Sequence, residues 1–376
     1  MIKILHCADI HLDSPFAGGN IQLSEQRRQE LRSSFINMMM YVRDNKVNLL
    51  LVSGDLFDSN SPAPDTVAMV IREFAAAVDT KIIISPGNHD FYFAGSVYEK
   101  YEFPKNVHIL KKDAMERVDI DALGVSVFGY AFTSRVMFNS PFAAMPDMDN
   151  ERINIIVAHG ELGNSSSDNC PISLTEIRDS GADYVALGHL HTGSEVLTEG
   201  KVRYAYSGSL EGRDFGERGE RGALIAAMAK SGDIFDMQSK FVRFSKRRYE
   251  TMKLDVTGVA TDEELLAKFD TAVRDAKYGD DTLLRVTIVG EAVTGLNVSE
   301  KTLASVADKL FYMELTDQSV PQVDISSLEH DPTIKGAFYE ALLPAFRGTD
   351  TAQRDIAEMA LRYGLAALDG NDIIDF

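Results

Sequence analysis

Short apolar runs alternate along the first two thirds of the chain with segments whose apolar residues recur every three or four positions. The apolar runs predict β-strands at 2–6, 48–53, 81–85, 125–130, 153–158 and 184–187. The helical spacing predicts helices at 24–45, at 64–78, which opens with a proline, and at 173–180. Strands separated by helices indicate an α/β layered fold, in which ligands bind beyond the carboxyl ends of the strands.

A second pattern begins after residue 248. Strands are expected at 249–256, 282–289 and 311–315, and helices at 262–277 and 299–310. This order describes a small β-α-β-α-β unit, and the polar, turn-rich residues 321–332 after it are typical of a linker. We therefore predict three parts, residues 1–248, residues 249–320, and residues 321–376 as a linker with C-terminal helices.

The last predicted part contains two amphipathic helices, at about 333–346 and 351–367. Their apolar faces consist of Phe338, Leu342 and Phe346, and of Ile356, Met359 and Tyr363. Because amphipathic helices usually cover the core of their own molecule, we expect these faces to pack on the body of the protein. The alternative is a helix of a partner, which makes residues 321–376 a candidate partner-binding segment.

Composition places the chain among globular proteins. Of its 376 residues 45% are apolar, which excludes a disordered chain and suffices for a buried core. No apolar run approaches the ~20 residues that cross a bilayer. The N-terminal apolar stretch ends at Asp9, too early for a secretory signal. The two cysteines, Cys7 and Cys170, give no disulfide framework, which fits a reducing compartment. From these three observations together we expect a cytoplasmic protein without a membrane segment.

The net charge of −19 is unevenly distributed. Residues 1–250 carry 27 Lys and Arg against 34 Asp and Glu, whereas residues 251–376 carry 11 against 23. Within the first part, residues 201–250 hold 11 basic and 7 acidic side chains and end in the basic run 243–248. The overall acidity argues against nucleic-acid binding, but this local basic stripe weakens that argument.

Five short motifs with metal-binding side chains follow directly after predicted strands. They are Asp9-Ile-His11, Gly54-Asp55-Leu-Phe-Asp58, Gly87-Asn88-His89-Asp90, His159-Gly160 and Gly188-His189-Leu-His191. One such motif is weak evidence, since D-x-H or G-x-D alone is commonly a satisfied loop or turn. H-x-H is stronger, because alternate positions of an extended strand put both imidazoles on one face. Packing alone does not explain five motifs at strand ends, so together they predict a metal centre.

The residue types favour two metal ions over one. Asp and His supply oxygen and nitrogen ligands suited to Mn, Fe or Zn, and Asn88 offers a neutral amide oxygen. Two carboxylates, Asp9 and Asp55, leave a centre with two divalent ions net positive, so that it attracts phosphate and lowers the pKa of bound water. Three glycines are expected to let the backbone turn tightly into the site; they are Gly54, Gly87 and Gly188.

The five motifs, in this order, resemble those of the calcineurin-like metallophosphoesterase superfamily. The segments HCADIHLDSPF, SGDLFDSNSPAPD, SPGNHDFY, DYVALGHLH and YSGSLEGRDFGERGERGA further resemble its SbcD/YhaO-type DNA repair exonucleases. The resemblance covers about residues 1–245 and extends to the rest only by architecture. It implies a four-layer α-β-β-α sandwich at 1–248, a small α+β capping domain at 249–320 and a C-terminal helical tail.

The resemblance also implies a role for each motif residue. One metal would be bound by Asp9, His11, Asp55 and His191, and the other by Asp55, Asn88, His159 and His189, with Asp55 bridging. His89 would not be a ligand but would donate to the leaving oxygen. The implied reaction is in-line attack on a phosphodiester by a metal-bridging hydroxide. Family members usually prefer Mn²⁺, although such ligands also bind Zn²⁺ or Fe.

Four further side chains stand close to the motifs. Asp58 is expected to lie behind the ligands rather than to bind metal. Asp90 is expected either to orient His89 by accepting its other N–H or to cap a turn. Arg213 either contacts a substrate phosphate or belongs to a solvated charged loop. His6 lies within a predicted strand and is expected to be a core residue or to support the ligands from behind.

The resemblance predicts a DNA exonuclease that acts in DNA repair as a homodimer with an SMC-like or AAA-type ATPase. The first alternative is a phosphodiesterase or phosphatase that acts on nucleotides or small phosphoesters with the same centre. The second is a non-catalytic binding subunit with a decayed site, against which the complete ligand set argues. The segments DSPF and GRDFGERGERG, together with the extra C-terminal domain, favour the nuclease.

Overall fold

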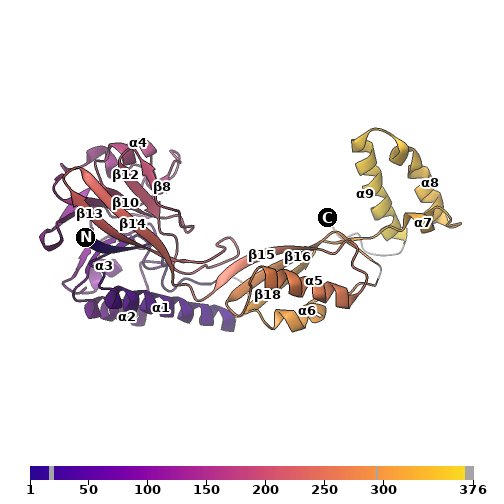
Figure 1. The fold of residues 1–376 in the computed structure, drawn as a ribbon, viewed down its shortest axis with the longest axis horizontal. Helices are drawn as coiled ribbons and strands as arrows, with labels where there is room; N and C mark the ends of the chain where they lie inside the picture. The colour runs from indigo at the N-terminus through magenta and orange to yellow at the C-terminus, as the bar shows by residue number, and fades with distance from the viewer. Residues whose placement is uncertain (17–20, 294, 369–376) are drawn as a thin grey trace. The chain divides into compact units, whose positions relative to one another are not determined.

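The computed structural model describes residues 1–16, 21–293 and 295–368 (Figure 1). The chain divides into two compact units, Met1–Tyr249 and Glu250–Phe376. This division lies one residue from the boundary expected at 248/249, while the further boundary at 320/321 stays a prediction. In the part of the chain that is described, no helix combines the length and the apolar character needed to cross a membrane.

The first sheet of the N-terminal unit has six strands in the order β14-β13-β1-β2-β3-β4. Its strands are β1 (Ile2–Cys7), β2 (Leu49–Ser53), β3 (Lys81–Ser85), β4 (Val107–Ile109), β13 (Gly222–Ser231) and β14 (Ile234–Arg243). Strands β1 to β4 are parallel, whereas the β13–β14 hairpin joins β1 in antiparallel register, with Ile4 opposite Ala226. The hairpin, which the sequence pattern did not predict, therefore closes one side of this sheet.

The second sheet also has six strands, in the order β11-β12-β10-β7-β6-β5. Its strands are β5 (Glu116–Ile120), β6 (Val125–Gly129), β7 (Ile153–His159), β10 (Tyr184–Gly188), β11 (Leu197–Glu199) and β12 (Val202–Tyr206). The four inner strands are parallel, and β5 and β11 pair antiparallel at the edges. The parallel strands of both sheets thus end in loops that can carry ligands.

Three apolar clusters hold these layers together. The cluster between the sheets joins residues such as Ile4 and Leu51 of the first sheet to Ile155 of the second. Helices α1 (Ile21–Asp44) and α2 (Pro64–Ala76) cover the outer face of the first sheet, where Phe35 and Phe74 are fully buried. The short helix α4 (Leu174–Asp179) packs on the outer face of the second sheet. The result is the predicted four-layer α-β-β-α sandwich.

Short elements complete the N-terminal unit. They are α3 (Val97–Lys100), the 3₁₀ turns at Asp121–Leu123 and Pro141–Ala144, and the two-residue strands β8 (Glu161–Leu162) and β9 (Pro171–Ile172). The β8–β9 pair follows His159 directly, so it fixes the chain as it leaves one of the predicted ligands.

The C-terminal unit contains a three-stranded sheet and two helices. They are β15 (Arg248–Asp255), α5 (Asp262–Asp275), β16 (Thr282–Val289), α6 (Glu300–Ala307) and β18 (Tyr312–Asp317), with β16 central in the sheet and the short pair β17 (Glu291–Ala292) and β19 (Val320–Pro321) beside it. The helices α5 and α6 and the sheet share one apolar cluster, in which Phe269 and Val286 are fully buried. The order β-α-β-α-β expected from the sequence is confirmed.

Three helices end the described chain: α7 (Ile325–Leu328), α8 (Ile334–Arg347) and α9 (Thr351–Leu368). They share a small apolar cluster built around Leu328, Tyr339 and Leu361. The expected packing of this α9 face on the body of the protein is not found, because Ile356 and Met359 are 63% and 54% exposed, and the alternative of a partner helix stays a prediction. The helix instead turns Leu361 and its neighbours toward α8, since a single amphipathic pattern does not specify the surface that covers it.

Candidate dinuclear metal centre

The eight motif side chains expected to bind metal or phosphate converge where the parallel strands of the two sheets end. Asp9 and His11 follow β1, Asp55 follows β2, Asn88 and His89 follow β3, His159 ends β7, and His189 and His191 follow β10. Contacts cross between the sheets, since the backbone N–H of His189 donates to the Asp9 carboxylate at 3.1 Å. Residues far apart in sequence therefore form one site.

Asp55 lies at the middle of this site. Its Oδ2 is 3.6 Å from His11 Nε2 and 3.5 Å from His159 Nε2, while its Oδ1 accepts from the backbone N–H of His89 at 2.9 Å. The carboxylate is 2% exposed. Burial would raise the pKa of Asp55, but the imidazoles of His159, His11 and His89 outweigh this and lower it. Asp55 therefore stays ionised between two imidazoles.

Three groups of side chains each bring one ligand atom apiece to within 4.8 Å of one another: Asp9, His11 and His191; Asp9, Asp55 and His159; and His11, Asp58 and His89. The third group contains Asp58 and His89, which were not expected to bind metal. Asn88 joins the second group, with its Oδ1 2.9 Å from His159 Nε2. The His189 ring packs edge-on to that of His159, with the centroids 5.3 Å apart.

Hydrogen bonds at the back of the imidazoles determine which nitrogens carry protons. His191 Nδ1 lies 2.6 Å from Glu217 Oε1, and His159 Nδ1 lies 2.9 Å from the carbonyl of Ser53. Because a carbonyl only accepts, His159 Nδ1 carries the proton and its Nε2 lone pair points into the site. At His191 the carboxylate of Glu217 favours the same tautomer, while the Arg213 guanidinium, which only donates, also lies 2.9 Å from Nδ1. Asp58 Oδ1, 3.2 Å from His11 Nδ1 but off the hydrogen-bond line, favours the same tautomer there.

The resulting arrangement fits bound cations. His11 Nε2 and His191 Nε2 face each other at 3.2 Å, and His159 Nε2 faces the oxygen of Asn88. Two lone pairs at such distances repel unless a positive charge lies between them. Nitrogen and oxygen ligands in this number suit divalent Mn, Fe or Zn. The residues present are thus compatible with two divalent metal ions.

Backbone strain concentrates at the ligand positions. Asp9 and His11 have φ of 49°, Asp55 has 50° and His189 has 105°. Residues other than glycine rarely adopt this left-handed region, which costs on the order of 1–3 kcal/mol at each position. The surrounding buried strands hold the loops in this conformation. The strained backbone in turn directs the ligand side chains toward a common point.

The motif glycines serve partly different purposes from those expected. Gly54 does adopt a left-handed conformation, with φ of 91°. Gly188 is required instead by close approach, because a Cβ there would lie 1.7 Å from the carbonyl oxygen of Ser53. A Cβ on Gly87 would lie 2.2 Å from Asp55 Oδ1. Gly188 and Gly87 are therefore needed because a side chain there would clash with a neighbouring strand and with Asp55, and not because the backbone turns at these positions.

Asp90 does not accept a hydrogen bond from His89 as one interpretation expected. Its carboxylate accepts from the backbone N–H groups of Gly87 and Phe57 and from the hydroxyl of Tyr98. Burial raises the pKa of Asp90 to about 6. Through these hydrogen bonds the buried Asp90 carboxylate caps the loop that carries Asn88 and His89. His89 Nδ1 lies instead 3.0 Å from the carbonyl oxygen of Asp58.

Sequence reasoning missed Glu217. Besides His191, it accepts from the backbone N–H and the Nε of Arg213, at 3.0 and 3.1 Å. Burial would raise the pKa of Glu217, but the hydrogen bond from His191 and the charges of His191 and Arg213 lower it to about 2. Arg213 also lies 3.5 Å from Asp58. The only sign of this role in the sequence is the position of Glu217 between Arg213 and Arg218 in the segment GRDFGERGERG.

His6 supports the site from within the core, as expected. It is fully buried, with Nδ1 2.9 Å from the Tyr184 hydroxyl and Nε2 3.1 Å from the carbonyl of Leu187. Burial lowers the pKa of His6 to about 3, so the ring is neutral near pH 7. These two contacts join β1 to β10, the strand whose end carries His189 and His191.

The comparisons with known proteins agree with this fold and site. A family model described as calcineurin-like phosphoesterase matches residues 2–193. The chain therefore belongs to the calcineurin-like phosphoesterase family, and the resemblance drawn from the five motifs is confirmed. The enzyme class that this family defines is a phosphoesterase hydrolase.

Individual relatives are similar at low identity. An uncharacterized metallophosphoesterase, YhaO, of Bacillus subtilis is 27% identical over 303 residues, 77% of this chain and 72% of the relative. The DNA double-strand break repair protein Mre11 of Methanopyrus kandleri is 23% identical over 70% of this chain and 61% of its own length. The SbcD component of the SbcCD nuclease of Bacillus subtilis is 24% identical over 62% of this chain and 67% of its own length.

Proposed function

We propose that this protein is a dinuclear-metal-dependent DNA exonuclease that hydrolyses phosphodiester bonds. The observation that carries the proposal is the position of Asp55, whose Oδ2 lies within 3.6 Å of the ligand nitrogens of both His11 and His159. A carboxylate held between two ligand imidazoles suits a bridging ligand, which a two-metal phosphoesterase needs.

The proposed ligand sets follow from this bridging position. Asp9, His11, Asp55 and His191 would hold one divalent ion, and Asp55, Asn88, His159 and His189 the other. When bound, two such ions supply Lewis-acid neutralisation of phosphate charge and lower the pKa of a coordinated water. Mn²⁺ is the proposed metal, with Zn²⁺ or Fe as alternatives, because this donor set accepts all three.

His89 is proposed to give a proton to the leaving oxygen. Its Nδ1 lies 3.0 Å from the carbonyl of Asp58 and carries a hydrogen, because a carbonyl only accepts. Nε2 is then the atom that takes up a second proton and transfers it. Arg213 stands on the same side, against Asp58 and Glu217, and its partly exposed guanidinium is proposed to contact a substrate phosphate.

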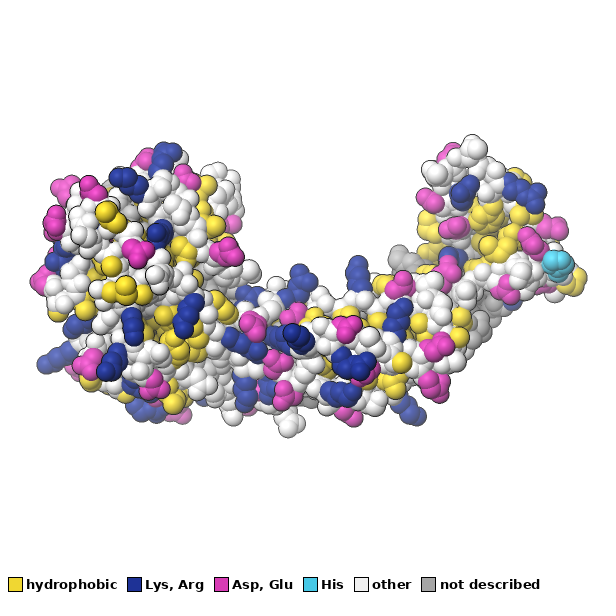
Figure 2. All heavy atoms as spheres, viewed as in Figure 1, with side chains coloured by type: hydrophobic (Ala, Val, Ile, Leu, Met, Phe, Trp, Pro, Cys, Tyr) yellow, Lys and Arg dark blue, Asp and Glu magenta, His cyan; other side chains and the backbone are white. Residues whose placement is uncertain are grey.

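The choice of DNA as substrate is supported by two relatives, whose names identify them as part of a nuclease and as a double-strand break repair protein. On this basis we propose a role in DNA repair, as a homodimer with an SMC-like or AAA-type ATPase. Exposed Ile334, Ile356 and Met359 in the C-terminal helices support a partner there, and Figure 2 shows apolar surface over these helices. The free, buried Cys7 and Cys170 support a reducing, cytoplasmic setting.

A substrate panel tests the proposal against its alternatives. Purified protein with Mn²⁺ is given linear duplex DNA, single strands, bis(p-nitrophenyl) phosphate and a phosphomonoester. We expect hydrolysis of DNA and of the diester. If only the monoester is hydrolysed, the protein is a phosphatase, and if nothing is hydrolysed, it is a binding subunit.

The same panel tests the role of His89. His89→Ala should lower diester hydrolysis by about 10²–10⁴-fold, as expected for loss of a general acid. His108→Ala, at an exposed histidine on β4, is the matched control and should retain full activity. Unchanged diesterase activity in His89→Ala would exclude the proposed proton transfer.

A further inference from the structure

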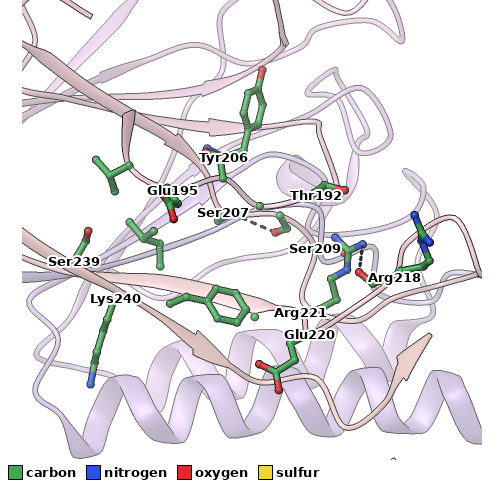
Figure 3. Close-up of a pocket in the computed structure, with 17 residues that line it drawn as sticks. Thr192, Glu195, Tyr206, Ser207, Ser209, Arg218, Glu220, Arg221, Ser239 and Lys240 are labelled. Carbon is green, nitrogen blue, oxygen red and sulfur yellow. Dashed lines mark hydrogen bonds between the residues drawn. The ribbon is translucent and has the colours of Figure 1, made fainter. Parts of the chain in front are cut away.

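A pocket of about 440 Å³ lies in the N-terminal unit directly behind the loop that carries His191 (Figure 3). Four chain segments form it: residues 192–196 after His191, 206–209 from the end of β12 onward, 218 to 224 (Arg218, 220–222 and Leu224) leading into β13, and 239–241 on β14. Its volume lies in the range of pockets that hold small organic ligands. None of the roles assigned above uses this pocket.

Arg221 is a buried cation on the wall of this pocket. It is 4% exposed, and its guanidinium donates to the backbone carbonyls of His191 and Arg218. Within the described residues, its Nε has no hydrogen-bond partner and no carboxylate lies within ion-pair distance of it. A buried charge is costly unless an opposite charge compensates it. Burial lowers the pKa of Arg221, and the charge of Glu217 offsets only part of this effect, so the buried guanidinium is incompletely compensated.

The other walls of the pocket are suited to the sugar and base of a nucleotide. Thr192, Ser207 and Ser209 contribute hydroxyl groups near Arg221, as Figure 3 shows. Phe241, on β14, is 46% exposed and offers a free aromatic face. The lining contains two acidic residues: Glu220 is paired with Arg243 at 3.3 Å, and Glu195 is exposed to solvent. Arg218 adds a second guanidinium beside Arg221.

We propose that this pocket binds a mononucleotide, with its phosphate against Arg221 and Arg218 and its base against Phe241. The proposal stands whether or not the metal centre cleaves DNA. Arg221 holds the backbone carbonyl of His191, and Ser209 donates to the same carbonyl through its backbone N–H at 3.0 Å. A phosphate on Arg221 therefore touches the support of a proposed metal ligand, which makes the pocket a place where a nucleotide can act on the centre.

Calorimetric titration of the full chain with dAMP tests this proposal. EDTA is present, so that phosphate cannot bind through metal ions. We expect one site per chain, and binding of deoxyadenosine weaker by about tenfold or more, because it lacks the charge-assisted hydrogen bonds. Absence of dAMP binding, or equal binding of deoxyadenosine, would overturn the proposal. Binding of a 5′-phosphorylated oligonucleotide but not of dAMP would do so too.

Variants locate the site. Arg221→Gln should weaken dAMP binding about tenfold or more, and a thermal melt checks that it folds. Because a buried arginine can be needed for folding, Arg218→Gln and Phe241→Ala serve as second probes, and Phe241→Ala should cost about fivefold or more through lost stacking. Phe138→Ala, at another exposed phenylalanine, is the matched control and should bind normally. Equal affinity in all four variants would contradict the assignment to this pocket.

Inorganic phosphate distinguishes the contribution of the phosphate group to binding from that of the base. We expect phosphate alone to compete with dAMP but to bind about fivefold or more weaker, because it lacks the stacking base. If phosphate binds as tightly as dAMP in the wild type, the base makes no contribution and the mononucleotide proposal fails.

Discussion

The metal centre and the C-terminal helices differ in how completely their surroundings define them. At the centre the ligand imidazoles are held from behind, His191 by Glu217 and His159 by the carbonyl of Ser53. The helices α8 and α9 share a small apolar cluster and leave Ile356 and Met359 exposed. The comparison shows that the centre is preorganised by buried neighbours, whereas the helices have an incompletely covered apolar surface.

The largest expected effect concerns the close approach of the two sheets at the centre. Gly188→Ala should destabilise the N-terminal unit by about 3 kcal/mol or more, because the added Cβ would overlap the Ser53 carbonyl and force the strands apart. Gly279→Ala is the matched control, since a Cβ there meets nothing within 4 Å. Thermal unfolding of both variants measures the difference. Equal melting temperatures would contradict the prediction and show that the two strands move apart at little cost in stability.

The next effect tests the small cluster of the helices. Leu361→Ala should destabilise α8 and α9 by about 2 kcal/mol, at the lower end for a buried leucine because this cluster is small and can relax. Ile356→Ala, one and a half turns away on the exposed side, should change stability by less than about 0.5 kcal/mol. Hydrogen exchange in α8 and α9 measures both, and a larger loss in Ile356→Ala would indicate that the face of α9 is assigned wrongly.

His6 should make the N-terminal unit sensitive to acid. Its pKa is about 3 in the folded chain, against the ordinary histidine value of 6.5, so the unfolded chain binds the proton more readily. The stability that His6 contributes is therefore present above pH 6.5 and is lost as pH falls toward 3, by about 2 kcal/mol at pH 5. Denaturant unfolding at pH 7.5 and pH 5 measures this loss.

The control for His6 is a histidine at the surface. His6→Gln should reduce the loss between pH 7.5 and pH 5 by about 2 kcal/mol, with the buried His11 and His189, whose pKa values are also lowered, causing part of what is left. His330→Gln, at an exposed position, should leave the loss unchanged. An identical pH dependence in the wild type and His6→Gln would mean that other groups cause the acid sensitivity.

The smallest effect tests the support behind one ligand. Glu217→Gln should weaken metal binding about tenfold, because the neutral amide no longer polarises His191. Glu220→Gln, in the same loop and paired with Arg243, should bind metal normally. Titration with Mn²⁺ measures both, and an unchanged affinity in Glu217→Gln would show that His191 is positioned by other contacts.

The ligands could be predicted from the sequence because each motif is short and follows an apolar strand. Glu217 could not, because its relation to His191 arises only when a loop 26 residues further on folds back. The hairpin β13–β14 was missed since its first strand, with Ala223, Ala226 and Ala227, has no clear alternation. Asp90 was open to two interpretations because its partners Phe57 and Tyr98 lie on separate segments.

The central claim is that Asp55 joins two metal ions in one site. Equilibrium dialysis of the full chain against Mn²⁺, with the bound metal measured by mass spectrometry, tests it most directly when Asp55→Asn is compared with the wild type. The claim predicts two ions per wild-type chain and loss of both from Asp55→Asn at the same free Mn²⁺. One ion per wild-type chain, or two ions retained by Asp55→Asn, would contradict it.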